Sequence, residues 1–186
     1  RLTLPRPHPA QTQIKAEARR YNILCCGRRF GKTCLGVDVA IEPALNGKPV
    51  GYFSPTYKML IEVWRDFCRL LRPVTQRVST QDHRVELFGG GVVEMWSLDN
   101  PDAGRGRKYA RVVPDEAAMV PHLRQAWEES IRPTLTDYAG DAWVLSTPKG
   151  LNYFHTRWLR GQDRLEQEWA SWQMPTTANP FIDPAE

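Results

Sequence analysis

The first residues of the chain that could do chemistry form a loop that starts at one glycine and reaches a Gly-Lys-Thr sequence. An apolar run precedes this loop and a helical pattern follows it, an order typical of a phosphate-binding P-loop, or Walker A motif. Backbone N–H groups and the N-terminus of the following helix face the phosphates in such a loop. We expect Lys32 to neutralise the β- and γ-phosphates, as a catalytic residue, and the Thr33 hydroxyl to hold Mg²⁺. The nucleotide-binding residues expected here are Gly27, Arg28, Arg29, Phe30, Gly31, Lys32, Thr33 and Cys34.

The start of this loop departs from the usual spacing. The pattern G-x-x-x-x-G-K-[ST] requires glycine at position 26, where the chain has Cys26. Gly27 comes one place late, so the sequence predicts a variant P-loop.

A pair of carboxylates, Asp115 and Glu116, follows the short apolar run 112–114. A strand that ends in Asp-Glu, the Walker B pattern, delivers both side chains to the sheet edge where the phosphates lie. We expect Asp115 to hold Mg²⁺ and Glu116 to polarise the attacking water as general base. The alternative is a surface pair at the N-terminus of the next helix, where acids are favoured; the upstream P-loop favours the catalytic interpretation. Pro114 cannot donate to a sheet, so we expect it at the strand's end or at a bulge.

Positive charge near the transferred phosphoryl group is the next requirement of an ATPase. The loop 104–108 contains Arg105 and Arg107, and either could act as an arginine finger, for its own site or for a neighbouring subunit's. A solvated basic loop is the equally weighted alternative. Arg28 and Arg29 within the P-loop are rival candidates.

A third motif, Ser146-Thr147-Pro148, follows another apolar strand pattern. Hydroxyl side chains at the end of a strand can sense the γ-phosphate by hydrogen bonding. Taken alone, the motif indicates an ordinary Ser-Thr-Pro turn, but beside the other two motifs we favour the functional interpretation.

The elements that must position these motifs alternate along the chain. Apolar runs predict strands at 21–26, 50–54, 111–113, 143–146 and 168–172, and helical periodicity predicts helices at 32–45, 58–71, 121–131 and 151–159. Residues 84–88 and 92–96 alternate like a β-hairpin around Gly89-Gly90-Gly91. Residues 1–10 form an extended lead-in. The alternation favours an α/β fold in a single domain, residues 1–186, with a mainly parallel sheet flanked by helices and a β-hairpin insertion.

Composition limits the partners and the cellular setting that we expect for the chain. The chain has 186 residues and a formal net charge of +4, which permits a polyanionic partner. No apolar stretch is long enough to span a membrane, so we expect no membrane partner. The four cysteines lack disulfide or C-x-x-C spacing and indicate reduced thiols in a cytosolic setting. The four histidines lack metal-ligand spacing.

The three motifs together resemble the ATPase domain of the large terminase subunit of tailed bacteriophages. The resemblance rests on residues 27–33, 112–118 and 146–150, in that order, and covers nearly the whole chain. It implies an additional-strand P-loop NTPase fold of the Asp-Glu type, with ATP as substrate and Mg²⁺ as cofactor. It also implies that Gln11 reads the adenine, with Gln13 as an alternative, and that Arg105 matches a finger acting between subunits. Ser146, Thr147 and Pro148 then couple hydrolysis to movement.

The same resemblance implies a motor that moves double-stranded DNA into an empty capsid in the host cytoplasm. Its implied partners are further copies of the chain in a ring, proposed to be pentameric, the portal and the small terminase subunit. Full-length members carry a C-terminal nuclease domain, which we expect to be absent here because Glu166, Glu168 and Asp183 form no obvious cluster of acids.

Two alternatives to a packaging ATPase remain open from the residues. Asp115-Glu116-Ala117-Ala118 loosely fits a DExx-box helicase or translocase, which normally needs a second motor domain. A nucleotide-gated assembly module without significant turnover is the other alternative.

Overall fold

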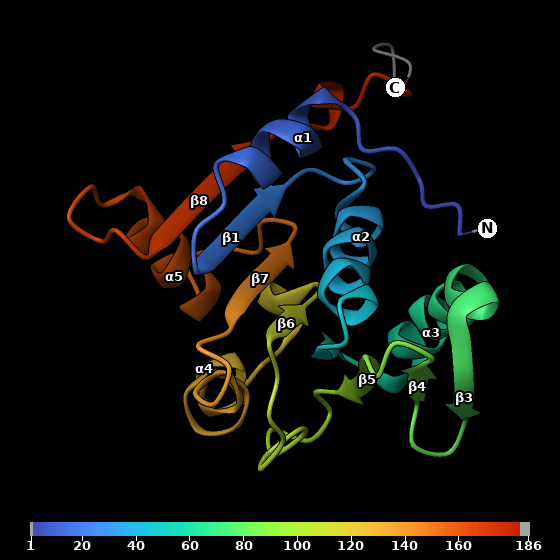
Figure 1. Cartoon of the computed structure of the whole chain (residues 1–186). Coiled ribbons are helices and arrows are strands. Elements are labelled where there is room, and N and C mark those ends of the chain that lie inside the picture. Colours follow the sequence, from blue (N-terminus) through green and yellow to red (C-terminus); the bar gives the residue numbers. More distant parts are fainter. Residues whose placement is uncertain (1, 183–186) are drawn as a thin grey trace.

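The computed structural model describes residues 2–182, whose strands form an eight-stranded sheet in the order β3-β4-β5-β2-β6-β7-β1-β8 (Figure 1). The strands are β1 (Tyr21–Cys26), β2 (Pro49–Ser54), β3 (Thr75–Ser79), β4 (Arg84–Leu87), β5 (Val92–Ser97), β6 (Arg111–Pro114), β7 (Asp141–Ser146) and β8 (Trp169–Met174). The α-helices are α1 (Pro9–Ala16), α2 (Lys32–Leu45), α3 (Tyr57–Leu71), α4 (Leu123–Gln125) and α5 (Tyr153–Gln162).

Six neighbouring strands, from β5 to β8 in the sheet order, run parallel. The carboxyl ends of parallel strands therefore meet at one edge of the sheet, above which α2 begins. The predicted α/β class with a mainly parallel sheet is confirmed. Pro114 is the last residue of β6, as expected for a residue without an N–H group.

The predicted hairpin is present and has a second role. β4 and β5 pair antiparallel, with Val85 opposite Val93, while β5 also pairs in parallel with β2. β5 is thus both a hairpin strand and a member of the parallel sheet. β3, which the sequence did not predict, pairs antiparallel with β4 and extends the sheet at its edge.

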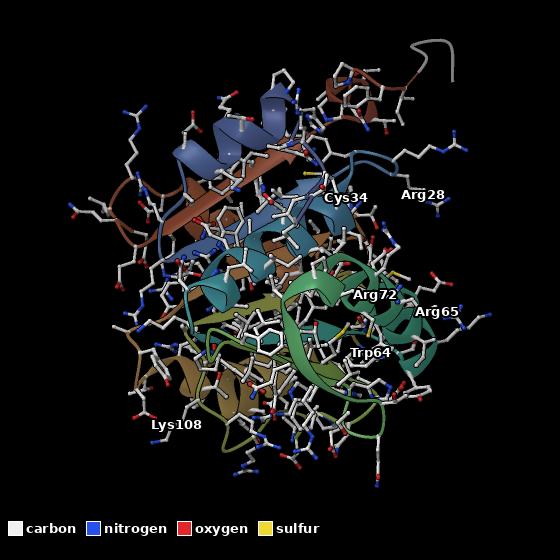
Figure 2. All side chains as sticks on the ribbon, turned by 45° about the vertical axis from the view of Figure 1, so that its right-hand side comes forward. Arg28, Cys34, Trp64, Arg65, Arg72 and Lys108 are labelled. Atoms are coloured by element: carbon white, nitrogen blue, oxygen red, sulfur yellow. The ribbon has the colours of Figure 1, made fainter. Side chains whose placement is uncertain are left out.

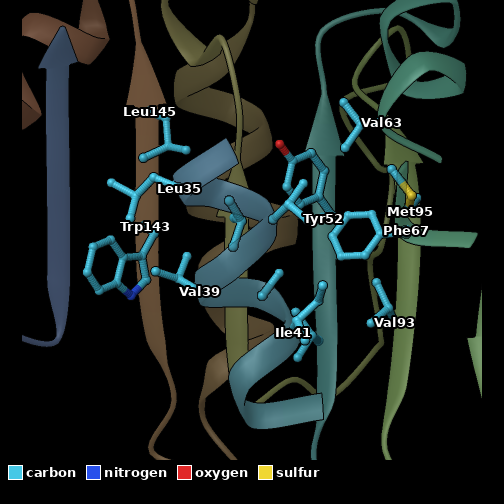
Figure 3. Close-up of a cluster of buried hydrophobic side chains, with 14 of the residues drawn as sticks. Leu35, Val39, Ile41, Tyr52, Val63, Phe67, Val93, Met95, Trp143 and Leu145 are labelled. Carbon is cyan, nitrogen blue, oxygen red and sulfur yellow. The ribbon is translucent and has the colours of Figure 1, made fainter. Parts of the chain in front are cut away.

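The two faces of the sheet carry different layers. Helices α2 and α3 cover one face, where Leu35, Val39, Tyr52 and Phe67 belong to one buried cluster (Figure 3). A Cβ atom on Gly36 of α2 would approach Leu145 Cδ1 to 2.7 Å, so glycine lets this helix lie close against the sheet. The close approach fixes the start of α2, and with it the Gly-Lys-Thr sequence, over the strand ends.

The opposite face carries α4, α5 and the loop that joins β5 to β6. Phe53, Val112, Trp127 and Phe154 belong to the buried cluster on this side. The helix predicted at 121–131 consists of α4 followed by a π-helical stretch (Ala126–Ile131) and a 3₁₀ turn (Arg132–Leu135). The backbone N of Pro133 cannot donate, which ends regular helical hydrogen bonding there.

The N-terminal lead-in is shorter than the sequence predicted. Helix α1 begins at Pro9, so the extended part within the described residues ends at His8. Proline is well suited to the first helical turn, where its missing N–H costs no hydrogen bond. Residue 1 lies outside the described residues, as does Asp183, one of the three acids considered above.

None of the helices in the described part of the chain has both the length and the apolar character needed to cross a membrane. All four cysteines are free thiols. Burial raises the pKa of Cys26, the residue in place of the usual glycine, to about 12. Cys26 is therefore a neutral core side chain at physiological pH.

Candidate active site

Four adjacent strands bring the three predicted motifs together. β2, β6, β7 and β1 are neighbours in the sheet, and their carboxyl ends lead into Ser54, Asp115, Ser146 and the loop after Cys26. The motifs are far apart in the chain, but parallel pairing places all of them at one edge. The edge can thus combine a phosphate loop, two carboxylates and two hydroxyl groups.

The Lys32 side chain lies at the centre of this edge and is only 6% exposed. Its Nζ donates to the carbonyl oxygens of Cys26 at 3.2 Å and Gly27 at 3.0 Å, and lies 3.7 Å from Glu116 Oε1. Gly31, just before it, has a φ of 92°, a left-handed conformation that favours glycine. The ammonium group is thus held between the loop and the Glu116 carboxylate.

Asp115 is buried and accepts hydrogen bonds on both carboxylate oxygens. Its Oδ2 accepts from Thr33 Oγ1 at 2.9 Å and from the Tyr52 hydroxyl at 2.8 Å, and its Oδ1 accepts from the Glu116 N–H at 2.9 Å. Burial raises the pKa of Asp115, and the hydrogen bonds from Tyr52 and Thr33 oppose that effect. The two residues predicted to hold Mg²⁺, Thr33 and Asp115, are therefore in direct contact.

Glu116 adopts a strained backbone conformation that directs its side chain toward β7. Its φ of 48° and ψ of 39° are left-handed, which is uncommon for a residue other than glycine. Its Oε2 accepts from the Thr147 N–H at 3.2 Å, from Thr147 Oγ1 at 3.1 Å and from Ser146 Oγ at 3.4 Å. Glu116 does not cap the following 3₁₀ turn with its side chain. The geometry thus favours the catalytic interpretation of the pair over the capping one.

Two cavities of similar size meet at Thr33 and Glu116. One, of about 240 Å³, is lined by Arg28, Arg29, Gly31, Lys32, Thr33, Cys34 and Glu116. The other, of about 230 Å³, is lined by Asp115 and by residues of α3 that include Glu62 and Asp66. A larger cavity, of about 380 Å³, lies at the start of β1 and β8, is lined by none of these residues, and has its arginines paired with glutamates. The chemistry of the side chains therefore identifies the smaller pair as the candidate site.

Gln11 lies against the loop, whereas Gln13 does not. Gln11 Nε2 donates to the Gly31 carbonyl at 3.0 Å, and its Oε1 accepts from the His8 N–H at 3.1 Å. His8 Nε2 in turn lies 2.9 Å from the carbonyl oxygen of Phe30. Gln13 bonds to Glu17 on the exposed side of α1. The amide of Gln11 is thus used to hold the loop, and His8 shares that role.

Arg28 and Phe30 lie in the loop, and Cys34 lies in the first turn of α2. The Phe30 ring is fully buried and packs edge-on against His8, and Phe30 is not among the residues lining the two cavities. Arg28 projects from the loop at the periphery of the molecule (Figure 2). Cys34 is exposed and lines the cavity of the loop.

The two arginines of the loop before β6 lie on the opposite face of the sheet from α2 and are not among the residues lining the two cavities. Arg107 lies 3.7 Å from the buried carboxylate of Glu94 and its guanidinium covers the Trp96 ring. Arg105 is 63% exposed and, within residues 2–182, pairs with Asp102 of its own loop at 3.0 Å. Both arginines are exposed, but Arg107 contacts Glu94 and Trp96 of the sheet, whereas Arg105 contacts Asp102 of its own loop.

Sequence reasoning did not identify several residues that support the site. The sequence predicts a strand at Tyr52 and an extended lead-in at His8, and it indicates no role in the site for either residue. Thr176 and Asn179 were outside every predicted motif, although their side chains donate to the carbonyls of Arg28 and Arg29 at 2.8 Å. No local pattern marks such contacts, because each joins residues distant in the chain.

Comparison with known proteins agrees with the resemblance seen in the three motifs. The chain is 32% identical over 189 residues to the terminase large subunit of Thermus virus P23-45; the match covers 84% of this chain and 36% of that protein. The chain thus spans just over a third of the length of this curated relative. No protein-family model matches the sequence.

Solved structures extend the comparison to the fold. The large terminase ATPase domain of Thermus phage P74-26 superposes with a TM-score of 0.75 at 25% identity, covering 91% of this chain and 81% of that one. The large terminase of a thermophilic bacteriophage, solved in complex with ATP-gamma-S, has a TM-score of 0.68 at 17% identity, covering 90% of this chain and 42% of that one.

Proposed function

Because the chain is a homologue of phage terminase large subunits over the part that forms their ATPase domain, we propose that it hydrolyses ATP with Mg²⁺ and thereby drives DNA packaging. The observation that carries this proposal is the contact of Thr33 with Asp115 beside the Lys32–Glu116 pair. A nucleotide site of this kind needs a cation, a metal ligand pair and a base within one cavity. The ATP-gamma-S complex of the thermophilic phage protein supports nucleotide as the ligand.

The residues present fit a magnesium ion. Mg²⁺ prefers oxygen ligands and is usually held by one or two protein groups together with substrate phosphates. Thr33 and Asp115 supply a hydroxyl and a carboxylate in contact. No group of three or more His, Cys, Asp or Glu residues that could hold a metal ion occurs in the described residues. When bound, the ion would neutralise charge on the phosphates.

In the proposed reaction Lys32 binds the phosphates, and Glu116 orients and deprotonates the attacking water. The Thr147 N–H and hydroxyl fix the position of that carboxylate. We propose that Ser146, Thr147 and Pro148 couple hydrolysis to movement because any displacement of Glu116 pulls on the end of β7. Gln11 holds the Gly31 carbonyl with one of the two N–H groups of its amide, and we propose that the other N–H contacts the adenine.

The proposed partners follow from the same relationship. They are double-stranded DNA, the portal, the small terminase subunit and further copies of the chain in a ring, acting in the host cytoplasm. The exposure of Arg105 supports a role at a neighbouring copy's site.

We expect Lys32→Ala to weaken ATP binding by about 10- to 100-fold, since hydrogen bonds to charged groups contribute about 1.5–3 kcal/mol. Titration with a fluorescent ATP analogue and Mg²⁺ measures the affinity, and phosphate release measures turnover. Lys48→Ala, at the opposite edge of the sheet, is the matched control. Equal affinity of wild type and Lys32→Ala would refute the proposed site, and tight binding without phosphate release in an assembled ring with DNA would favour the assembly module.

Tyr52→Phe tests whether the hydrogen bond from the Tyr52 hydroxyl supports the function of Asp115. The change removes one of the two donors to Oδ2 and leaves the buried ring in place. We expect ATP hydrolysis to need about three- to tenfold more Mg²⁺ for half-maximal rate, the effect of one hydrogen bond. Tyr57→Phe, at an exposed position at the start of α3, is the control. An unchanged Mg²⁺ dependence would show that Tyr52 serves packing alone.

A further inference from the structure

The carbonyl oxygens of residues 26–31 in the phosphate loop all accept hydrogen bonds from side chains. Those of Cys26 and Gly27 accept from Lys32 Nζ. The next four accept from side chains of two distant segments: those of Arg28 and Arg29 from the stretch after β8, and those of Phe30 and Gly31 from the start of α1. Six consecutive carbonyls therefore have partners.

Outward carbonyls have a direct consequence for the N–H groups. The C=O and N–H of one trans peptide point in opposite directions, and the chain has no cis peptide in its described part. Fixing the carbonyls of residues 28, 30 and 31 outward therefore turns the N–H groups of residues 29, 31 and 32 toward the concave side, whereas the Phe30 N–H donates to the Gly27 carbonyl at 3.4 Å. Those N–H groups are the ones a phosphate needs.

The stretch after β8 makes close contact with the loop. We name residues 175–182 the C-terminal brace; it contains the 3₁₀ turn Thr176–Ala178. Thr176 Oγ1 donates to the Arg28 carbonyl and Asn179 Nδ2 to the Arg29 carbonyl, both at 2.8 Å. The Gly27 N–H donates to the Met174 carbonyl at 2.9 Å, so the loop and the end of β8 are also joined by backbone.

Gly27 gives an independent sign of this contact. A Cβ atom on Gly27 would lie 2.6 Å from Thr176 Oγ1 and 2.9 Å from the Thr176 backbone nitrogen. Backbone cannot give way as a flexible side chain can, so a larger residue would push the brace off the loop. The displaced glycine of this variant P-loop is therefore required by the brace.

We propose that Thr176 and Asn179 are positioning residues of the phosphate site, which hold the loop in its phosphate-binding conformation from the outside. Such preorganisation raises affinity because binding no longer has to order the loop. The coupling is reciprocal, so phosphate binding must stabilise the brace by the same free energy. The inference rests on the proposed function for its ligand, but its structural content concerns the loop alone.

The test compares wild type with Thr176→Val, Asn179→Leu and the double variant. Each substitution keeps side-chain size and removes the donor to the loop carbonyl; Asn179→Leu also removes the acceptor of the Phe181 N–H. Thr177→Val, in the same turn and exposed, is the matched control, and Thr176→Ser retains the hydroxyl and should restore binding. We expect the affinity for a fluorescent ATP analogue with Mg²⁺ to fall about fivefold for each single variant and about 20-fold for the double, from the usual effect of one hydrogen bond.

Hydrogen exchange provides the readout that does not depend on nucleotide. Without nucleotide, the amides of residues 29–32 should exchange faster in the double variant than in wild type or Thr177→Val. The melting temperature should fall by no more than about 8 °C, the shift expected for two hydrogen bonds of about 1 kcal/mol each in a domain of this size. Loop exchange and affinity equal to those of Thr177→Val would overturn the inference. A wild type that binds no nucleotide would instead overturn the proposed function, and loop exchange would still decide the role of the brace.

Discussion

Replacing Glu116 with glutamine is expected to lower the rate constant of ATP hydrolysis by about 10²- to 10⁴-fold, the usual contribution of a general base. Glutamine has the same shape, and its amide oxygen can still accept from Thr147. It cannot take a proton from water. ATP affinity should therefore stay near wild type, because Lys32 and the loop are unchanged.

The control for this prediction is Glu62→Gln. Glu62 lines the neighbouring cavity with Asp115 and Glu116 but lies on α3 and contacts neither the loop lysine nor β7 in the described structure. Glu62→Gln changes the charge of the cavity by the same amount as Glu116→Gln does. Single-turnover hydrolysis and nucleotide titration on both variants separate chemistry from binding. Comparable rates for Glu116→Gln and Glu62→Gln would exclude Glu116 as the base.

The sequence predicted the loop and its flanking elements well because each is specified locally. The strand ending at Cys26 is an apolar run, and α2 begins at Lys32 as predicted. The edge geometry followed from the rule that parallel strands end together. Thr33 and Asp115 could therefore be placed near each other without a structure.

Elements specified by distant contacts were missed. β3 is mostly polar and exposed, and its strand conformation comes from pairing with β4. The contact between Tyr52 and Asp115 joins residues 63 positions apart, and that between Thr176 and Arg28 joins residues 148 apart. The spacing of motifs cannot predict such contacts, because they depend on the order of strands in the sheet and on the path of the C-terminal segment.

The choice between Arg105 and Arg107 shows what packing adds to a motif. Both lie in one glycine-rich loop, and spacing could not separate them. Arg107 contacts Glu94, which also accepts from Arg84 and the Tyr109 hydroxyl within a buried network. Although both arginines are exposed, these contacts hold Arg107 against the sheet, whereas Arg105 pairs with its own loop and is the better candidate to reach another molecule.

Arg105→Ala is accordingly expected to lower hydrolysis in the assembled ring by about 10³-fold or more, the usual effect of losing an arginine finger. Nucleotide affinity of the separate chain should be unchanged, because Arg105 is not among the residues that line the two cavities. Lys108→Ala is the control, an equally exposed cation of the same loop that pairs with Asp137. Phosphate release per subunit, measured against protein concentration with DNA present, reports the assembled state.

Mixing two inactive variants distinguishes action between subunits from action within one. An Arg105→Ala chain retains Glu116, and a Glu116→Gln chain retains Arg105. If Arg105 acts on a neighbour, mixed rings contain interfaces at which an intact base meets an intact arginine, and activity should return to about a quarter of wild type at equal proportions, as expected for random pairing of two components. No recovery in rings shown to contain both chains would place Arg105 at its own site or outside the reaction. Because the Arg105 guanidinium is exposed and, among the described residues, pairs with Asp102 of its own loop, we expect recovery.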